Sequence, residues 1–108
     1  MKGPDAARSA PVFAALGDPT RLRLLARLSS GGPRSIARLT SGTRVTRQAV
    51  TKHLHVLAGA GLVRDLRRGR ERIWELEPSR LGDARRWLDA VSAQWDEALE
   101  RLRAAVER

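Results

Sequence analysis

The spacing of the apolar residues changes twice along the chain. Between residues 9 and 60 they recur every three or four positions, which predicts four short helices separated by turns. Between residues 62 and 76 apolar and polar residues alternate, as they do in a β-hairpin. Beyond Pro78 the helical spacing returns and continues almost to the last residue. The pattern therefore predicts four helices, one hairpin and one long helix, in that order.

The first three helices should begin at capping residues. Three polar residues stand where N-caps are expected: Ser9, Asp18 and Ser35. The second helix is expected to turn three leucines inward: Leu22, Leu25 and Leu28. We expect residues 1–8 to be a disordered tail ahead of a single domain that covers residues 9–108.

The fourth helix, capped by Thr46 and running to about Ala60, has two different faces. On a helical wheel three apolar residues fall within about 40° of one another and form the buried stripe: Val50, Leu54 and Leu57. The opposite face is polar and carries no acidic residue: Gln48, Thr51, Lys52 and His55, with Arg47 beside them. A tight turn at Gly42 joins this helix to the previous one. This is the layout of a helix-turn-helix, whose second helix lies in the DNA major groove.

The two histidines do not form a metal site by their spacing. His53 and His55 stand two positions apart and point to nearly opposite sides of a helix, whereas metal-binding histidines on one helix are typically four apart. The chain has no cysteine, which excludes thiolate ligands and disulfides. We expect no metal and no cofactor, with His53 packed and His55 facing solvent.

The predicted hairpin turns at Gly69 and is rich in arginine. Four of its positions are expected to face the core: Leu62, Leu66, Trp74 and Leu76. Five arginines surround the turn: Arg64, Arg67, Arg68, Arg70 and Arg72. A solvated strand face would mix the two signs more evenly, and here only Asp65 and Glu71 intervene. A basic loop beside a reading helix can neutralise DNA phosphates or enter the minor groove, as in a winged helix.

The charge of the chain favours the same partner. The formal net charge is +9, and residues 1–82 hold 16 Lys or Arg against 6 Asp or Glu, whereas residues 83–108 hold 5 against 6. A basic body suggests a polyanion, with double-stranded DNA foremost. No stretch approaches 18 apolar residues and the N-terminus has no apolar run, so we expect a soluble cytoplasmic protein without a membrane partner.

The chemistry of the grooves assigns a role to each polar residue of the helix-turn-helix and the hairpin. Base edges are expected to be read by Arg47, Gln48 and Thr51. The DNA backbone is expected to be held by Thr46, Lys52, His55, Arg67, Arg68, Arg70 and Arg72.

The last helix carries one apolar stripe: Leu81, Ala84, Leu88, Val91, Trp95, Leu99, Leu102 and Val106. A stripe of this length is more than one small domain can cover, and it indicates a partner. Trp87 lies beside this stripe, and Trp95 belongs to it. They could line a small-molecule pocket between protomers or belong to a dimer core, for which tryptophan is well suited.

In this order and spacing, the segments resemble the ArsR-type (arsenic-repressor-like) winged-helix transcription regulators over about residues 10–106. The matching pieces are "ALGDPTRLRLLARL", "TRQAVTKHLHVLAGAGLV", "RRGRERIWEL" and the amphipathic final helix. The resemblance implies a homodimeric bacterial repressor that binds a palindromic operator, with its first and last helices paired across a two-fold axis. The dimer interface that it implies consists of Phe13, Leu88, Val91, Trp95, Leu99 and Leu102.

The sequence departs from the metal-sensing members of that family. Those members carry cysteines around the helix that matches Ser35–Ser41, or aspartate, histidine and glutamate ligands on the last helix. Here residues 35–41 read "SIARLTS" and residues 78–108 contain no histidine. The resemblance is therefore to a branch without recognisable metal ligands, and regulation is expected from an organic ligand, a protein partner or the concentration of the repressor itself.

Three other functional classes predict different behaviour. An enzyme would need an activated nucleophile with a base or a phosphate-binding glycine loop, and the sequence shows neither, so we predict no enzymatic activity. A nonspecific or architectural DNA-binding protein would share the charge but bind all sequences equally. A protein-interaction module acting through the last helix would not need the hairpin arginines.

Overall fold

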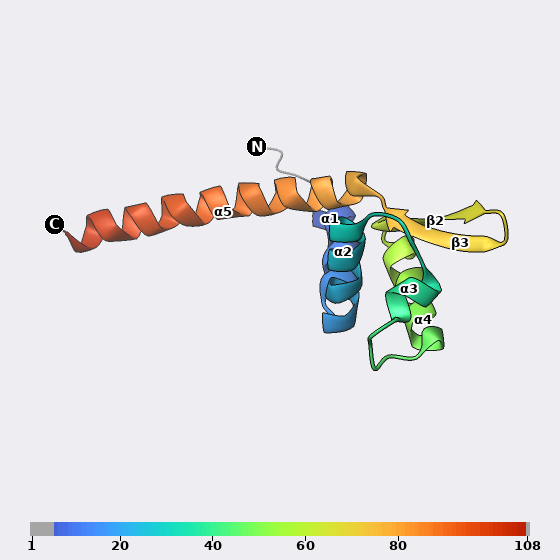
Figure 1. Cartoon of the computed structure of the whole chain (residues 1–108). Helices are drawn as coiled ribbons and strands as arrows, with labels where there is room; N and C mark the ends of the chain where they lie inside the picture. The colour runs from blue at the N-terminus through green and yellow to red at the C-terminus, as the bar shows by residue number, and fades with distance from the viewer. Residues whose placement is uncertain (1–5, 108) are drawn as a thin grey trace.

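The computed structural model describes residues 6–107 and confirms the predicted order of helices and hairpin, with one strand added (Figure 1). Its elements in chain order are α1 (Ala6–Leu16), α2 (Pro19–Gly31), β1 (Arg34–Ser35), α3 (Ile36–Thr40), α4 (Arg47–Gly59), β2 (Val63–Arg68), β3 (Glu71–Leu76) and α5 (Pro78–Val106). The strands form an antiparallel sheet in the order β1-β3-β2. The fold is mainly helical, with a small sheet in which β1, from the segment ahead of α3, pairs with the β2–β3 hairpin that follows α4.

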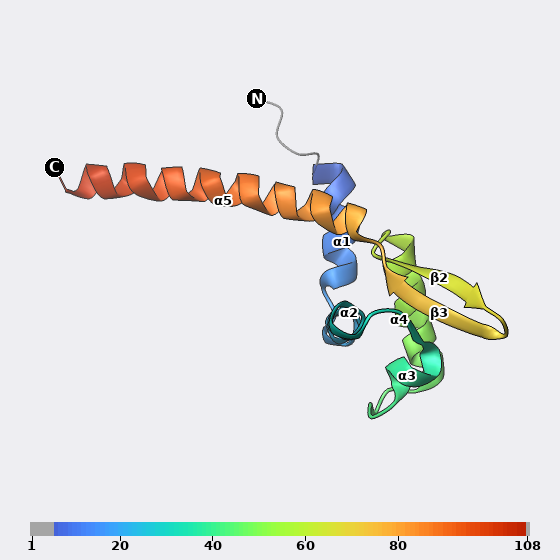
Figure 2. The same cartoon turned by 45° about the horizontal axis from the view of Figure 1, so that its top comes forward.

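Most elements gather in a body from which α5 projects. The molecule measures 67 × 29 × 20 Å along its principal axes. The far end of α5 and the β2–β3 hairpin, here called the wing (residues 63–76), point in opposite directions in both views (Figures 1 and 2). In the described residues, no helix combines the length and the apolar character that crossing a membrane requires.

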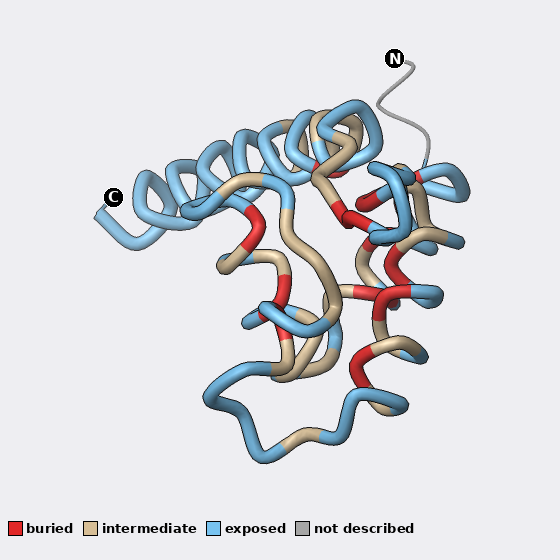
Figure 3. The backbone as a smooth tube through the Cα atoms, turned by 45° about the vertical axis from the view of Figure 1, so that its right-hand side comes forward, coloured by how far each residue is buried: buried red, intermediate tan, exposed pale blue. Residues whose placement is uncertain are grey.

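The core lies inside the body, beneath the first turns of α5 (Figure 3). Every helix of the body and the wing contribute to it: Val12 and Ala15 from α1, Leu24 and Leu28 from α2, Leu39 from α3, Val50, Leu54 and Leu57 from α4, Val63 and Trp74 from the wing, Leu62 before it, and Ala84 from α5. The predicted stripe of α4 is thereby confirmed. In contrast, residues 92–107 are exposed along their whole length.

Two of the three predicted caps at the first three helices are confirmed. The Asp18 side chain accepts a hydrogen bond from the backbone N–H of Arg21 at 3.0 Å, and the Ser35 hydroxyl oxygen accepts one from the N–H of Arg38 at 3.3 Å. The prediction for Ser9 was wrong, because α1 begins at Ala6 and Ser9 is buried inside it. Alanine and arginine are good helix formers, so the helix extends ahead of the serine. The rest of the expected tail, residues 1–5, lies outside the described residues.

The inward face of α2 differs from the predicted one. Leu24 and Leu28 are buried, whereas Leu22 is 49% exposed. At about 100° per residue, Leu22 lies about 160° from Leu24 around the helix. Repeated three-residue steps drift by about 60° each, so the 22–25–28 spacing spreads over too wide an arc to form one face.

The strand register corrects the prediction for the wing. Asp65 pairs with Trp74, and Leu66 pairs with Ile73. Since neighbouring side chains of a strand point to opposite faces, Leu66 lies on the face opposite Trp74 and outside the core that Trp74 enters. Alternation within each strand does not set the register between strands, and a one-residue difference moves a side chain to the other face.

Candidate nucleic-acid interface

Arg27 of α2 fastens the end of α3. Its guanidinium donates to the carbonyl oxygens of Leu39 at 2.7 Å, Ser41 at 3.2 Å and Arg38 at 3.0 Å. Carbonyls at the end of a helix lack partners inside the helix, so this contact satisfies them and fixes α3 against α2. No sequence pattern pointed to Arg27, because its partners lie 11 to 14 positions away and are backbone atoms that leave no pattern in the sequence.

The turn between α3 and α4 is closed by its own side chains. Gly42 has a φ of +76°, a conformation that favours glycine. The Thr43 hydroxyl donates to the Thr40 carbonyl oxygen at 2.7 Å, and the Thr46 hydroxyl oxygen accepts from the N–H of Ala49 at 3.1 Å. The Thr46 cap is confirmed, and the start of α4 is held at a defined place and angle.

The outer face of α4 presents the predicted polar side chains. Four of them are exposed: Arg47, Gln48, Lys52 and His55. Thr51 is half-buried, and its hydroxyl donates to the Arg47 carbonyl oxygen at 2.9 Å. The hydroxyl donor of Thr51 is therefore engaged, which leaves an acceptor lone pair and a methyl group for a base edge.

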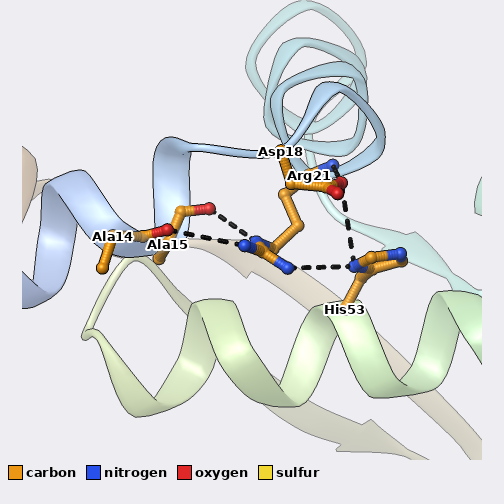
Figure 4. Close-up of polar contacts among 5 residues, drawn as sticks. All are labelled: Ala14, Ala15, Asp18, Arg21 and His53. Atoms are coloured by element: carbon orange, nitrogen blue, oxygen red, sulfur yellow. Dashed lines mark hydrogen bonds and ion pairs between the residues drawn. The ribbon is translucent and has the colours of Figure 1, made fainter.

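His53 lies on the inner side of α4 and points toward Asp18 and Arg21 at the start of α2 (Figure 4). Its Nδ1 lies 3.4 Å from Nη1 of Arg21 and 3.9 Å from Oδ2 of Asp18. Arg21 in turn donates to the carbonyl oxygens of Ala15 and Ala14 at the end of α1, at 2.6 and 3.4 Å. The prediction of a packed, hydrogen-bonded His53 is confirmed.

The Asp18 carboxylate belongs to the same group of side chains. Its pKa is lowered mainly by the hydrogen bond from the Arg21 backbone N–H; partial desolvation opposes this, and the charges of His53 and Arg21 add to it. The group ties α1, α2 and α4 together behind the polar face of α4.

On the outer side, His55 connects α4 to the wing. Its ring meets the Trp74 ring edge-on, with the centroids 5.8 Å apart. The Arg72 guanidinium lies 5.4 Å from the Trp74 centroid, and its Nε donates to Oδ2 of Asp65 at 2.6 Å. The Arg72 hydrogen bond lowers the pKa of the Asp65 carboxyl, and the charge of nearby His55 contributes. The His55–Trp74 contact joins α4 to the wing, and Arg72 links the two strands of the wing beside that contact.

The wing arginines fall into two groups. Arg72 pairs with Asp65, and Arg64 pairs with Glu75 at 2.6 Å and with Glu77 at 3.0 Å. The other three surround Gly69, are exposed and form no ion pair within residues 6–107: Arg67, Arg68 and Arg70, here called the basic tip. Only the basic tip thus carries uncompensated positive charge in the described part of the wing.

Comparison with known proteins identifies the family. Residues 16–65 match a helix-turn-helix domain family. The chain is 39% identical over 85 residues to the HTH-type transcriptional regulator Rv2034 of Mycobacterium tuberculosis, a match that covers 79% of this chain and 76% of the relative. Its fold is similar to that of an ArsR-like transcriptional regulator from Rhodococcus sp. RHA1, with a TM-score of 0.78, 35% identity and 92% of both chains covered. The chain belongs to the ArsR-type family of winged-helix transcription regulators.

A second similar structure is the solution NMR structure of a homodimeric winged helix-turn-helix DNA-binding domain from Mycobacterium bovis. It is 25% identical, has a TM-score of 0.63, and the match covers 94% of this chain and 95% of that one. The ArsR-type chain is thus a transcriptional regulator with a DNA-binding fold, and not an enzyme. In this regulator, α4 is the second helix of the helix-turn-helix and residues 63–76 form the wing.

Within residues 6–107 of this ArsR-type regulator, no three histidine or acidic side chains gather where they could hold a metal ion. The two histidines are engaged separately, His53 with Arg21 and Asp18, and His55 with Trp74. The polar chemistry of the candidate interface is therefore that of hydrogen-bond donors and cations, which suits bases and phosphates.

Proposed function

We propose that this ArsR-type regulator is a homodimeric repressor that binds a palindromic operator in double-stranded DNA. The observation that carries the proposal is the juxtaposition of two surfaces. The outer face of α4 presents exposed donors without an acidic residue, and the wing that packs on it through His55 and Trp74 ends in the basic tip. One surface suits base edges in the major groove, and the other suits the neighbouring phosphates.

The contacts divide into reading and positioning. Arg47, Gln48 and Thr51 read base edges, with Thr51 contributing its methyl group because its hydroxyl donor is engaged. The DNA backbone is held by Thr46, Lys52 and His55 on or beside α4 and by the three arginines of the basic tip. Arg72, first expected to hold a phosphate, has a different role in this proposal. Paired with Asp65 and stacked on Trp74, it positions the wing.

The dimer forms through the exposed stripe of α5. Its large apolar side chains are unusually accessible, with Trp95 65%, Leu99 55% and Leu102 61% exposed. The homodimeric Mycobacterium bovis domain supports the proposal that a second copy of the chain covers this stripe. Leu88 and Val91 continue the stripe toward the body, and Phe13 supports it by packing its ring on Trp87 at 5.5 Å between centroids. A two-fold dimer then presents two reading helices about 34 Å apart, one for each half-site.

The dimer would repress transcription by occupying its operator. Two reading helices and two wings would cover a continuous stretch of duplex, so other proteins could not bind a promoter that overlaps the operator. In a reporter strain, expression of the regulator should lower transcription from the operator-bearing promoter. A rise would instead identify an activator.

Selection of bound sequences from a random DNA pool tests the central proposal. A palindromic consensus with half-sites about one helical turn apart is the expected result. A pool that stays random after several rounds would indicate the nonspecific DNA-binding protein. A pool that is never retained would favour the protein-interaction module.

A further inference from the structure

A cavity of about 340 Å³ lies between α2 and the turn of the helix-turn-helix. Its size falls within the range of small-molecule pockets, roughly 300–1,000 Å³. The turn itself forms one wall, from Gly42 to Val45. Whatever fills the cavity therefore touches the segment that sets the start of the reading helix.

The floor of the cavity is apolar. It includes Leu24, Leu39 and Val50, whose side chains belong to the core and are 0–3% exposed. Water against this apolar floor has few hydrogen-bond partners there, so an apolar group that displaces it gains free energy. The floor therefore favours an occupant with a hydrophobic body.

The lining is also positively charged. Arg23, Arg27 and Arg44 line the cavity, and no acidic residue does. Arg27 is engaged with the carbonyls of α3, whereas Arg23 and Arg44 are exposed and have no ion pair among residues 6–107. Two free guanidinium groups at an apolar cavity favour an occupant with a carboxylate or a similar anion.

We propose that this cavity binds a small organic acid. The hydrophobic body of the acid lies against Leu24, Leu39 and Val50, and its carboxylate lies between Arg23 and Arg44. A DNA phosphate would suit the arginines but would leave the apolar floor empty, so a small amphipathic acid fits the cavity better than the operator does.

The consequence for DNA rests on the proposed function. Arg44 lies in the turn just ahead of Thr46, the cap of the reading helix. A carboxylate that pairs with Arg44 removes a positive charge from the approach to the DNA backbone. The acid should therefore bind the free regulator more tightly than the operator complex, and allosteric couplings of this kind are typically about 5- to 150-fold.

The binding half is tested without DNA. The ¹⁵N-labelled full chain is titrated with three acids and their matched alcohols: octanoate and 1-octanol, phenylacetate and 2-phenylethanol, indole-3-acetate and tryptophol. The expected result is saturable shifts of the amides around Leu24, Val45 and Val50, with at least one acid binding at least tenfold more tightly than its alcohol. No saturable shift with any acid, equal affinity for acid and alcohol, or shifts confined to α5 would overturn the proposal.

Variants test the two arginines. Arg23→Gln combined with Arg44→Gln should weaken the acid at least tenfold and leave the alcohol unchanged, whereas the conservative Arg44→Lys should retain most of the affinity. Arg85→Gln on the exposed side of α5 removes a charge away from the cavity and should change nothing. Undiminished binding of the acid by the double variant would contradict the assigned carboxylate position. If the double variant does not fold, the two single variants and the map of shifted amides decide.

The regulatory half is measured on the selected operator by fluorescence anisotropy. Saturating acid should lower operator affinity at least fivefold. If the chain selects no operator, the DNA-free titration still stands, so failure of the proposed function is distinguishable from failure of the cavity. If the acid binds but operator affinity is unchanged, the regulatory half is wrong.

Discussion

The body and the projecting part of α5 (residues 92–106) carry the same apolar spacing, but the apolar side chains are buried in the body and exposed in the projecting part. In α4 the stripe of Val50, Leu54 and Leu57 is 0–1% exposed, because α2, α3 and the wing cover it. In α5 Leu99 and Leu102 are 55% and 61% exposed, and no part of residues 6–107 covers them (Figure 3). Periodicity thus predicts which face is apolar, but the fold decides whether the cover comes from the same chain or from another.

The two parts of the chain also differ in net charge. Residues 1–82 hold 16 basic against 6 acidic residues, and residues 83–108 hold 5 against 6. A basic surface attracts a polyanion, whereas a balanced helix with an apolar stripe suits a copy of itself. We therefore expect the body to bind DNA and the projecting part of α5 to form the dimer, and variants in the two regions should have separable effects.

The largest effect is expected from Leu99→Glu combined with Leu102→Glu. Four buried charges in a two-fold interface should leave a monomer, measured by sedimentation velocity at micromolar concentration. The body should remain folded, because its core extends no further along α5 than Ala84. Operator affinity should fall by about 10²-fold or more, since the advantage of two linked half-sites is lost.

The matched control adds the same charges to the opposite side of the helix. Ala93→Glu with Ala104→Glu should stay dimeric and bind the operator normally, since both alanines lie more than about 140° from Trp95 around α5. If the leucine variant remained a stable dimer, the apolar stripe of α5 would not be the interface.

Gln48→Ala should weaken operator binding by the body without changing the dimer. Loss of a base contact is expected to cost about 1–3 kcal/mol on the selected operator and much less on random DNA. The dimer should be unchanged, because Gln48 lies on α4, remote in sequence from the stripe of α5. Gln94→Ala, which removes the exposed glutamine of α5, is the control and should leave operator affinity intact. An equal loss on all DNA sequences would move Gln48 from the reading group to the backbone group.

Features that depend on one segment could be predicted from the sequence, whereas features that depend on the pairing of two segments could not. α4 was predicted correctly because its three apolar side chains fall on one arc and Thr46 marks its start. The strand Arg34–Ser35 was missed because two residues are too few to show alternation. Leu66 was assigned to the wrong face because the pairing of Asp65 with Trp74 is a property of two strands together.

Charge partners were harder to predict than charge. The arginines of the wing were all recognised, but only the folded structure shows that Arg72 is paired with Asp65 while Arg70 is not paired within the described residues. Arg27 escaped notice for a related reason, since its partners are carbonyl oxygens. Composition supplies the number of cations near an interface, and the fold determines how many remain available to DNA.

Arg70→Ala and Arg72→Ala should differ in the salt dependence of DNA binding. Arg70 belongs to the basic tip, so its loss should reduce the slope of log affinity against log salt by roughly 1. Arg72 is already neutralised, so its loss should weaken binding by loosening the wing while leaving the slope nearly unchanged. Asp65→Asn frees the Arg72 guanidinium, so the salt dependence of DNA binding should become steeper or stay the same. If Arg72→Ala reduced the slope as much as Arg70→Ala does, Arg72 would contact a DNA phosphate.

The smallest effect, none at all, is expected from transition metals. Release by zinc or a similar ion requires several nitrogen, sulfur or carboxylate ligands converging at fixed geometry. The imidazoles of this regulator lie in the body, where His53 is held by Arg21 and Asp18 and His55 rests on Trp74. The carboxylates Asp96 and Glu97 lie on the projecting part of α5, which contains no histidine or cysteine. Within residues 6–107, neither region completes a ligand set. A two-fold dimer on DNA should also keep the two His55 side chains apart, because its reading helices lie about 34 Å from each other. Titrating zinc, cadmium, copper and nickel into the operator complex should leave its anisotropy unchanged. Stoichiometric release at submicromolar metal, reversed by a chelator, would place a carboxylate site on the projecting helix and give that region a second role beside dimerisation.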